Sequence, residues 1–563
     1  MNPWPQFRGA GLQTRLHWRI VRGIGRWGAA AMLLLALSAP WPAQATATGA
    51  PSAQTLTIAE TSLPSGLNPL IDPRDSTADI THALFDSLLS ADPHDVLVPD
   101  LATGYTVSDH GLRYQFTLNP QARWQDGVPV TADDVLFTTR LMRDPKFPAA
   151  NRFGYGSIAS ISADGSLTVT ITLHSPFAPF LRAFATTPLL PSHVLGLIPS
   201  DKLAGYTFFN QHPVTDGPYT LAGITTGATT LAANPAYFGG TPRINQLVYK
   251  LEPNESTALA DLRSGAVQLV SPSVGTTSSD LLATLRQSGV TAYSSPGYGW
   301  THIDLIESGF LRDHVVRQAL TYATPRQTII TKVFHGLVSP ADGDQPPTSQ
   351  YYQPSIADTL GYDPSQIPAL LRKHGYALKH GVWGKFGLQL RITLWTDSGC
   401  ADCETVANLV AASWSAARIP TSVRTENTHK LFGYHGPLYN PDRLYSTQLN
   451  AVLYTWTTSP EPDDSFYWST KMIVRPGNLS GGNFDGFSNA TVDRLIGDAL
   501  TATNDGQRVA LYQRIQTLLV EDQPDIFLYW AQHFTLATTA LSGYQANPFS
   551  PGIAWNLTKW RLG

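Results

Sequence analysis

Charged side chains are scarce in this sequence. Asp, Glu, Lys and Arg together make up 14% of its 563 residues, against about a quarter in an average globular protein. The formal net charge is −4, so the chain has no excess of positive charge with which to bind nucleic acid or an acidic membrane surface. Nucleic acid is therefore excluded as a partner class.

No acidic residue occurs before Glu60. Five arginines precede the apolar run AAAMLLLALSA at 29–39. This run is short for a membrane span. Small residues at 43–45 suit a cleavage site, so this region predicts an export signal that is cut after Ala45. An uncleaved membrane anchor is the alternative. No cysteine lies near the cut, which argues against a lipid anchor, and no later apolar run has spanning length. We expect a periplasmic protein.

Cysteine is almost absent. The two cysteines, Cys400 and Cys403, lie in the segment CADC. In an exported protein such a pair is expected to form a local disulfide. A redox-active pair is the alternative, but the βαβ pattern that typically surrounds one is missing. A zinc site would need more ligands at suitable spacing than the neighbouring sequence offers.

The usual catalytic motifs are missing too. The sequence has no HExxH, no GxSxG and no phosphate-binding loop. A catalytic triad dispersed along the chain stays open, because such triads follow no fixed order. His302 and Asp304 form at most a weak metal pair, since two ligands do not make a site. We therefore expect neither an enzyme nor a bound metal or cofactor.

Apolar and aromatic residues are abundant, and their spacing predicts mixed helices and strands. The chain is 42% hydrophobic and long enough for two or three domains. Alternating or continuous apolar runs predict strands at 56–60, 112–118, 166–173, 388–395, 451–456 and 525–530. Helical spacing predicts helices at 76–90, 311–336 (two helices meeting near Pro325), 366–376, 403–419 and 507–524. This mixture indicates an α/β protein of at least two lobes.

The segment WQDGVPVTADDVLFT at 124–138 contains a helix start. Thr131 can cap the first turn, and Asp134 is placed to bond back to the amide of Thr131. Both Asp133 and Asp134 also meet the positive end of the helix dipole. This capping box explains a local structure and carries no functional meaning by itself.

Taken together with other segments of the chain, this stretch resembles a known protein family. The sequence is similar to the extracytoplasmic solute-binding proteins of the peptide/nickel type, solute-binding protein family 5, which serve ABC importers. The matching segments run in family order along nearly all of the mature chain: LNPL (67–70), LFDSLLSADP (84–93), LVPDLATGYTVSDHGLRYQFTLNPQARWQDGVPVTADDVLFT (97–138), PVTDGPYTL (213–221), NPAYFGGTPRINQLVYK (234–250), DHVVRQALTYA (313–323), GLVSPADG (336–343), GFSNATVDRLIGDA (486–499) and RVALYQRIQTLLVEDQPDIFLYW (508–530).

The resemblance implies the two-lobed periplasmic binding protein fold, type II, in its three-region variant, with a hinge and a ligand cleft between the lobes. Lobe one would combine 54–298 with 531–563 and contain an accessory region at about 84–211. Lobe two would span 299–530. The chain would cross between lobes near 298–303 and 528–532. The implied partners are a peptide or small polar solute and a membrane permease, and we expect a monomer.

Two segments depart from the family pattern. Members that bind free peptide ends hold the amine with an aspartate in a W-x-x-D context, where this chain reads WTTSPEPDD with Ser459 in that place. Asp463 or Asp464 could substitute in a reshaped loop. Dipeptide-binding members also carry an arginine in the loop that here reads TDSGCADC, without Arg or Lys. Because a buried ammonium without a carboxylate is costly, the hypothesis is a longer peptide held by its backbone, or a neutral or sugar-like solute, rather than a free dipeptide.

For the cleft we predict aromatic faces with a few hydroxyl groups, which suit a small polar ligand. The candidate ligand-binding residues are Thr61, Ser62, Tyr298, Trp300, Trp456, Thr457, Ser459 and Asp463. The alternative is that Trp300 and Trp456 are core residues beside the hinge. A receptor component that delivers ligand to a signalling partner, and a secreted hydrolase, remain the competing functions.

Overall fold

Eleven of the described strands join in one long mixed sheet. The computed structural model describes residues 54–72, 74–272, 279–357, 359, 361–432, 436–444, 450–457, 460–550 and 552–563, so the predicted export signal lies outside them. Within the compact unit Ala53–Gly563, the sheet runs in the order β18 (Thr421–Glu426), β17 (Ile392–Asp397), β19 (Ala451–Thr457), β12 (Val290–Leu305), β20 (Asp525–Thr538), β11 (Leu269–Val270), β1 (Thr55–Glu60), β10 (Gln246–Leu251), β9 (Ala228–Ala233) and β8 (Tyr219–Ile224), and β13 (Ser339–Pro340) also pairs with β20.

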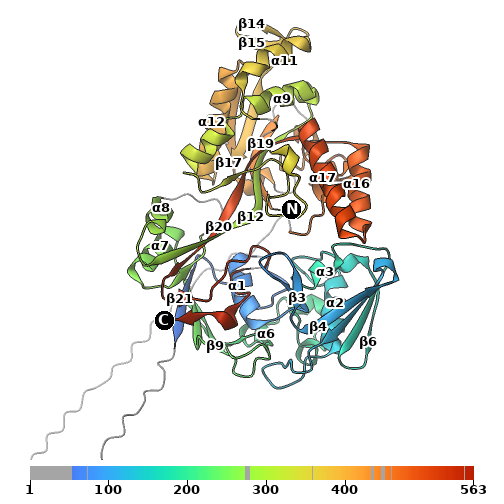
Figure 1. The fold of residues 1–563 in the computed structure, drawn as a ribbon, viewed down its shortest axis with the longest axis vertical. Coiled ribbons are helices and arrows are strands. Elements are labelled where there is room, and N and C mark those ends of the chain that lie inside the picture. Colours follow the sequence, from blue (N-terminus) through green and yellow to red (C-terminus); the bar gives the residue numbers. More distant parts are fainter. Residues whose placement is uncertain are drawn as a thin grey trace, which may run out of the picture. The chain divides into compact units, whose positions relative to one another are not determined.

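The long strands β12 and β20 lie side by side at the centre of this sheet (Figure 1). They pair antiparallel from Val290 with Thr538 to Asp304 with Asp525, and the register shifts between Pro296 and Trp300. Both predicted crossing points, 298–303 and 528–532, fall within these two strands. One continuous pair of strands therefore joins the two ends of the sheet.

Four smaller sheets complete the strand pattern among the described residues. One has four antiparallel strands, and the others have two or three: β4 (Ala102–Ser108), β5 (Arg113–Leu118), β7 (Thr168–Leu173) and β6 (Ile158–Asp164); β14 (Ala377–Lys379), β15 (Val382–Lys385) and β16 (Leu388–Gln389); β2 (Leu89–Ala91) and β3 (Leu97–Pro99); β21 (Leu541–Ser542) and β22 (Arg561–Leu562). The four-stranded sheet lies inside the predicted accessory region.

Amphipathic helices cover these sheets. The longer ones are α1 (Asp75–Leu84), α2 (Ala132–Arg143), α7 (Glu255–Ser264), α9 (His314–Tyr322), α12 (Ala401–Ala416), α16 (Ala490–Thr501) and α17 (Asp505–Asp522). Shorter helices include α3 (Phe180–Ala183) and α11 (Ile367–Lys373). Helices α16 and α17 pack against each other (Figure 1). No helix in the described ranges is both long enough and apolar enough to span a bilayer.

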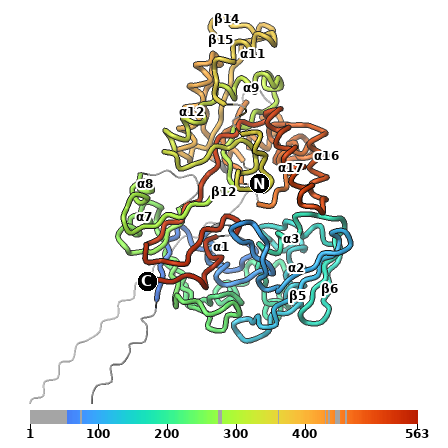
Figure 2. Tube along the Cα trace, viewed as in Figure 1, coloured from blue at the N-terminus to red at the C-terminus, as the bar shows by residue number. Residues whose placement is uncertain are grey.

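The buried apolar side chains form separate cores. The largest cluster contains only residues from 56–269 and 537–560, and a second contains only residues from 303–529. The C-terminal segment contributes to the first because it returns to the N-terminal half, where the backbone N–H of Ile553 donates to Asp79 at 2.7 Å. Figure 2 shows this red C-terminal trace beside α1. The two largest clusters thus draw on different parts of the chain, as the two-lobed fold requires, and four smaller clusters accompany them among the described residues.

Most predicted elements are confirmed, and two predictions need correction. The helix predicted at 76–90 ends at Leu84, and β2 follows. The carbonyl of Leu84 accepts a hydrogen bond from Gly217 at 2.9 Å, and a Cβ at residue 217 would lie 2.6 Å from the Leu84 carbonyl carbon. This tertiary contact, which needs a glycine, takes the place of the next helical turn.

The strand predicted at 388–395 is wrong as a single element. Its first part, β16, pairs with β15 in a small sheet, whereas β17 pairs with β18 and β19 in the long sheet. One apolar run therefore serves two sheets, which periodicity alone does not reveal.

The predicted capping box at Thr131 is confirmed and extends further than expected. Helix α2 begins at Ala132, and Asp134 accepts the backbone N–H of Thr131 at 2.8 Å. The same carboxylate also accepts the backbone N–H and hydroxyl of Ser192 at 2.8 and 2.7 Å and the indole N–H of Trp124 at 3.3 Å. Asp134 is 2% exposed, so it joins three segments within the accessory region.

Replacing Asp134 should therefore destabilise the protein, and replacing its neighbour should not. We expect Asp134→Ala to lower the free energy of unfolding by about 2 to 4 kcal/mol, because several buried donors lose their acceptor. Asp133 is exposed, and Asp133→Ala should change it by less than about 0.5 kcal/mol. Urea unfolding followed by circular dichroism measures both values. Equal losses in the two variants would contradict this role.

Candidate functional site

Strand pairing brings four of the predicted ligand-binding residues together. Tyr298 and Trp300 lie on β12, and Trp456 and Thr457 lie on β19. In the register of these two strands Trp300 faces Trp456, and Gly299 faces Thr457. Trp300 and Trp456 therefore lie on one face of the sheet, and Thr457 lies on the opposite face.

Trp300 and Trp456, which face each other across the two strands, differ in exposure. Trp300 is 2% exposed and packs against Trp530 and Tyr467, with ring centroids 5.9 and 5.6 Å apart. Trp456 is half-buried and lies 4.8 Å from the Tyr467 ring. Trp300 is thus a core side chain, as the alternative interpretation has it, whereas Trp456 keeps an open face.

The other predicted residues lie elsewhere. Thr61 is exposed just after β1, and the half-buried Ser62 shares a 2.8 Å hydrogen bond with the hydroxyl of Ser76. Asp463 is half-buried and accepts the backbone N–H of Ser465 at 3.0 Å, which fixes its own loop. Ser459 lies outside the described residues.

Tyr298 has a buried hydroxyl group for which the described structure provides no hydrogen-bond partner. The residue is 5% exposed and its ring lies 5.7 Å from that of Phe549. Burial, together with the charge of Asp95, raises the pKa of this phenol well above its usual range. Buried polar groups are nearly always paired, so an unpaired hydroxyl at this place is a candidate ligand contact.

A buried arginine next to Tyr298 was missed by sequence reasoning. Arg182, on α3, forms an ion pair with Asp95 through its Nη2 atom, and the residue is 5% exposed. Its Nε and Nη1 atoms are buried without a hydrogen-bond partner among the described residues. Arg182 also lines a cavity of about 410 Å³. Nothing in the local sequence distinguishes it from a surface arginine.

A second ion pair lies close to the first. Arg508, on α17, pairs with Glu461, donates to the hydroxyl of Tyr351 at 2.7 Å and donates to the carbonyl of Pro462 at 3.3 Å. Burial raises the pKa of Glu461, and the charges of Arg508 and Arg182 oppose that rise. Because Arg182 and Asp95 both act on Glu461, the two pairs are neighbours.

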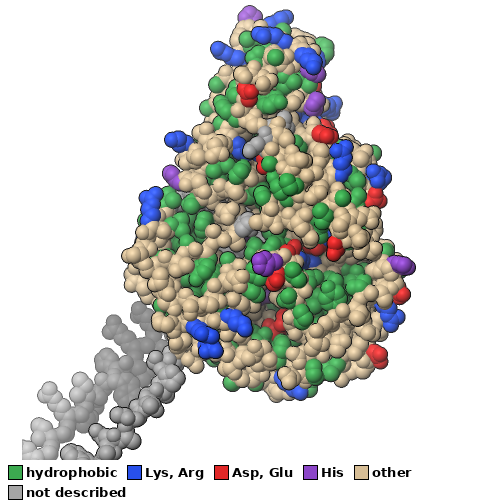
Figure 3. Space-filling view, in the orientation of Figure 1, with side chains coloured by type: hydrophobic (Ala, Val, Ile, Leu, Met, Phe, Trp, Pro, Cys, Tyr) green, Lys and Arg blue, Asp and Glu red, His purple; other side chains and the backbone are tan. Residues whose placement is uncertain are grey.

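We call Asp95, Arg182, Tyr298, Tyr351, Glu461 and Arg508 the Tyr298 cluster. Its members come from the predicted accessory region, from β12 and from the predicted lobe two. Each nitrogen of the Arg508 guanidinium has a partner, in Ala499 of α16, in Tyr351 or in the 461–462 loop, whereas Arg182 and Tyr298 keep atoms without a partner among the described residues. Figure 3 shows acidic and basic side chains gathered around a hollow across the middle of this face.

The loop that in dipeptide-binding members carries an arginine is closed by a disulfide. Cys400 and Cys403 are bonded, which confirms the predicted pairing. Cys400 is the residue before α12, and its sulfur accepts the backbone N–H of Cys403 at 3.2 Å. The bond therefore fixes the first turn of this helix.

Comparison with known proteins assigns this chain to a family. Residues 96–472 match the family model for bacterial extracellular solute-binding proteins, family 5. The chain belongs to this family.

Relatives with printed functions support the assignment. The oligopeptide-binding protein AppA of Bacillus subtilis is 26% identical over 505 residues, which cover 89% of this chain and 90% of AppA. A Brucella ovis protein named as an ABC transporter peptide-binding protein is 26% identical over 478 residues, covering 83% of this chain and 85% of that protein. The solved structure of AppA in complex with a nonapeptide superposes with a TM-score of 0.70 at 25% identity, covering 90% of this chain and 99% of that chain.

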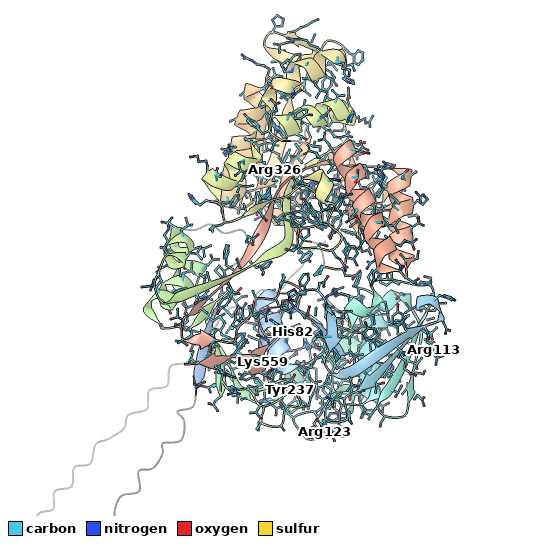
Figure 4. The ribbon with its side chains drawn as sticks, viewed as in Figure 1. His82, Arg113, Arg123, Tyr237, Arg326 and Lys559 are labelled. Atoms are coloured by element: carbon cyan, nitrogen blue, oxygen red, sulfur yellow. A yellow bond between two sulfur atoms is a disulfide. The ribbon has the colours of Figure 1, made fainter. Side chains whose placement is uncertain are left out.

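This solute-binding protein has a second cavity, of about 200 Å³, between the N-terminal half and the C-terminal segment 550–558. Its lining includes His82, Asp86, Asp100 and Tyr237, and Figure 4 shows His82 and Tyr237 in the same half of the molecule. Burial raises the pKa of Asp100 to about 7 and lowers that of His82 to about 4. Burial and the charges of Asp100 and Asp216 raise the pKa of Asp86. Burial therefore disfavours the charged form of each of these groups.

A third set of buried polar side chains lies beside Trp300. His302, Asp304 and Asp525 are all buried, and their ligand atoms lie within 4.8 Å of one another. Burial, with the charges of Asp304 and Asp485, raises the pKa of Asp525. From the sequence, only His302 and Asp304 could be recognised as a pair. Asp525 joins them through strand pairing, and Asp485 comes from a distant loop.

The raised pKa of Asp100 predicts a pH dependence of stability. The folded protein holds this proton up to pH near 7, whereas the unfolded chain releases it near 3.8, the ordinary pKa of an aspartate, so the folded state binds more protons in this window. Stability should therefore fall as pH rises from about 4 to 7. We expect Asp100→Asn to remove about 1 to 2 kcal/mol of that fall, after allowance for partial exposure.

Thermal unfolding between pH 4 and 8 measures this effect. The melting temperature of Asp100→Asn should decline less over this range than that of the wild type. Asp133→Asn, at an exposed position, should follow the wild-type curve. Parallel curves for wild type and Asp100→Asn would show that Asp100 titrates normally.

Proposed function

We propose that this protein is the extracytoplasmic substrate-binding component of an ABC importer. It captures a peptide or another small polar solute between two lobes and delivers it unchanged to a membrane permease. The family membership supports this role, as does the Brucella relative named as an ABC transporter peptide-binding protein. The relatives bear the names of binding proteins, which supports binding without catalysis.

The proposed lobes are 54–298 with 531–563, and 299–530. The separate hydrophobic clusters support these boundaries, because the largest draws on 56–269 and 537–560 and the second on 303–529. The joint between the lobes would then be the β12 and β20 pair, whose register shifts between Pro296 and Trp300. A break in strand register at this point suits a hinge, which concentrates backbone rotation in a few residues.

The observation that carries the proposal is the Tyr298 cluster. Three buried polar atoms, the hydroxyl of Tyr298 and the Nε and Nη1 atoms of Arg182, have no hydrogen-bond partner among the described residues. All three can donate hydrogen bonds, and the cluster that holds them combines residues of both proposed lobes. A ligand that brings carbonyl or carboxylate oxygens would satisfy them.

A longer peptide fits these donors better than a free dipeptide. A peptide backbone presents a row of carbonyl oxygens, which suits a guanidinium group and a phenol placed side by side. The 398–403 loop has no cation for a dipeptide carboxylate. Of the acids that follow the family's amine-binding place, Glu461 is paired with Arg508, Asp463 accepts the backbone N–H of Ser465, and Asp464 is buried. AppA, which is similar over most of its length, was solved in complex with a nonapeptide.

Titration calorimetry with peptide pools tests this function. We expect a pool of five- to nine-residue peptides to bind with a Kd near one micromolar, about −8 kcal/mol, and a dipeptide pool to give no heat at the same concentrations. Micromolar binding of dipeptides would contradict the ligand class. Absence of binding to every peptide, sugar and amino acid pool would contradict the function itself.

A pair of tyrosine variants separates a ligand contact from a structural one. The hydroxyl of Tyr298 has no hydrogen-bond partner in the described part of the chain, so Tyr298→Phe should weaken peptide binding about tenfold without lowering stability. The buried hydroxyl of Tyr219 donates to the carbonyl of Ile244 at 2.9 Å. Tyr219→Phe should therefore cost about 1 kcal/mol of stability and leave affinity unchanged. Calorimetry and thermal unfolding of both variants check this reciprocal pattern.

The proposed location is the periplasm, reached through the cleaved export signal. We expect the protein isolated from its own cells to begin at Thr46, directly after the predicted cut at Ala45. Intact-mass measurement decides this point. A mass that includes residues 1–45 would favour the uncleaved membrane anchor.

A further inference from the structure

A histidine and two aspartates meet in the interior beside Trp300. Nε2 of His302 lies 2.8 Å from Oδ1 of Asp304 and 3.7 Å from Oδ2 of Asp525. The three residues are 2%, 4% and 6% exposed. They belong to the paired strands β12 and β20, so the backbone hydrogen bonds of the sheet hold their spacing.

The hydrogen bonds around this group fix its protonation. Nδ1 of His302 lies 3.3 Å from the carbonyl oxygen of Trp300, which can only accept, so Nδ1 carries the hydrogen. Nε2 then presents a lone pair to the oxygen of Asp304, and a proton or a metal ion must lie between these two acceptors. The hydroxyl of Tyr454 donates to the other oxygen of Asp304 at 2.8 Å. Histidine ligands of metals typically donate their second nitrogen to a carbonyl, and carboxylate ligands are typically held by such a donor.

A fourth acidic side chain lines the same small cavity. Asp485 is 3% exposed, and its Oδ2 atom is buried without a hydrogen-bond partner among the described residues, as is Oδ1 of Asp525. Asp485, Asp525, Asp304 and His302 line one small cavity of about 10 Å³. That is about the space of a single water-sized particle. Two unsatisfied carboxylate oxygens in so small a cavity call for a cation.

We propose that His302, Asp304 and Asp525 bind one divalent transition-metal ion of the zinc class, with Asp485 as a further carboxylate that lines the same cavity. One imidazole nitrogen with carboxylate oxygens suits Zn²⁺ or Mn²⁺, whereas Ca²⁺ and Mg²⁺ prefer oxygen ligands alone. Ligand bonds of about 2.1 Å in a tetrahedral arrangement place ligand atoms about 3.4 Å apart. The separations from His302, 2.8 and 3.7 Å, lie on either side of this value.

The ion would join segments that are distant in the sequence. His302 and Asp304 come from β12, Asp525 comes from the first residue of β20, and Asp485 comes from the loop before α16. Tyr454, on β19, would act through Asp304 as a positioning residue. The site lies in the proposed lobe two and is distinct from the Tyr298 cluster, so it would be structural rather than a place for transported solute.

Metal analysis of the full chain tests the proposal. Protein produced with added zinc chloride and passed through gel filtration should retain about one ion per chain, measured by inductively coupled plasma mass spectrometry. A strong chelator with mild heating should remove the ion and lower the melting temperature by several degrees. Calcium chloride in place of zinc chloride should leave less than a tenth of an ion per chain.

Three variants distinguish ligands from neighbours. Asp525→Asn should lose the bound zinc, and Tyr454→Phe, which keeps every ligand, should weaken zinc binding about 10- to 100-fold. Asp344→Asn is the control, because Asp344 is equally buried and its carboxylate accepts the indole N–H of Trp468 at 2.7 Å, outside the proposed ligand set. It should retain zinc as the wild type does.

Two outcomes would overturn the proposal. One is a wild-type protein without zinc whose melting temperature responds to neither zinc nor chelator, which would mean that a proton alone joins His302 to Asp304. The other is equal zinc retention in wild type, Tyr454→Phe and Asp344→Asn, which would place the ion elsewhere. If Asp525→Asn fails to fold, the Tyr454→Phe measurement decides by itself.

Discussion

The antiparallel pairing of β12 with β20 is the constraint on which the rest of this structure depends. It runs from Val290 with Thr538 to Asp304 with Asp525 and joins the strands that bear the two main hydrophobic cores. Side chains alternate along a strand, so Tyr298, Trp300, His302 and Asp304 share one face of β12. The candidate ligand contact, the aromatic packing and the proposed cation site are thus successive positions on a single face.

A chain with few charges places several of them in its interior. Arg182, Arg317 and Arg508 are each 5% exposed or less, and burying a charge is costly unless partners surround it. Arg317 illustrates the compensated case, because its guanidinium donates to the carbonyls of Leu311 and Asp522, both at 2.7 Å, and also pairs with the Asp522 carboxylate. Arg182 illustrates the other case, with two nitrogens left over. This difference distinguishes Arg317, a structural arginine, from Arg182, which has nitrogens available for the proposed ligand.

The sequence predicted what depends on neighbours along the chain. Capping at Thr131, the Cys400–Cys403 bond and most strands follow from spacing and residue type, and the ordered motifs indicated the family. The early end of α1 could not be foreseen, since it depends on Gly217, far along the chain. The same holds for Arg182 and Asp525, whose roles arise only when distant elements pack. One signal was available: YGWTHID at 298–304 puts polar groups at alternate positions of a central strand, where apolar side chains are expected.

The unsatisfied donors of the Tyr298 cluster also explain how binding could drive closure. A buried donor without a partner costs about 1 to 3 kcal/mol, and Tyr298 and Arg182 together hold three such atoms. In a closed structure without ligand this cost favours opening, because water reaches the same atoms once the lobes separate. If a peptide contacts these atoms as proposed, it removes the cost only in the closed form and binds that form better, and a ligand shifts an equilibrium by its differential affinity for the two states. The same atoms therefore oppose empty closure and favour filled closure, which is the behaviour that a permease needs in order to tell a loaded protein from an empty one.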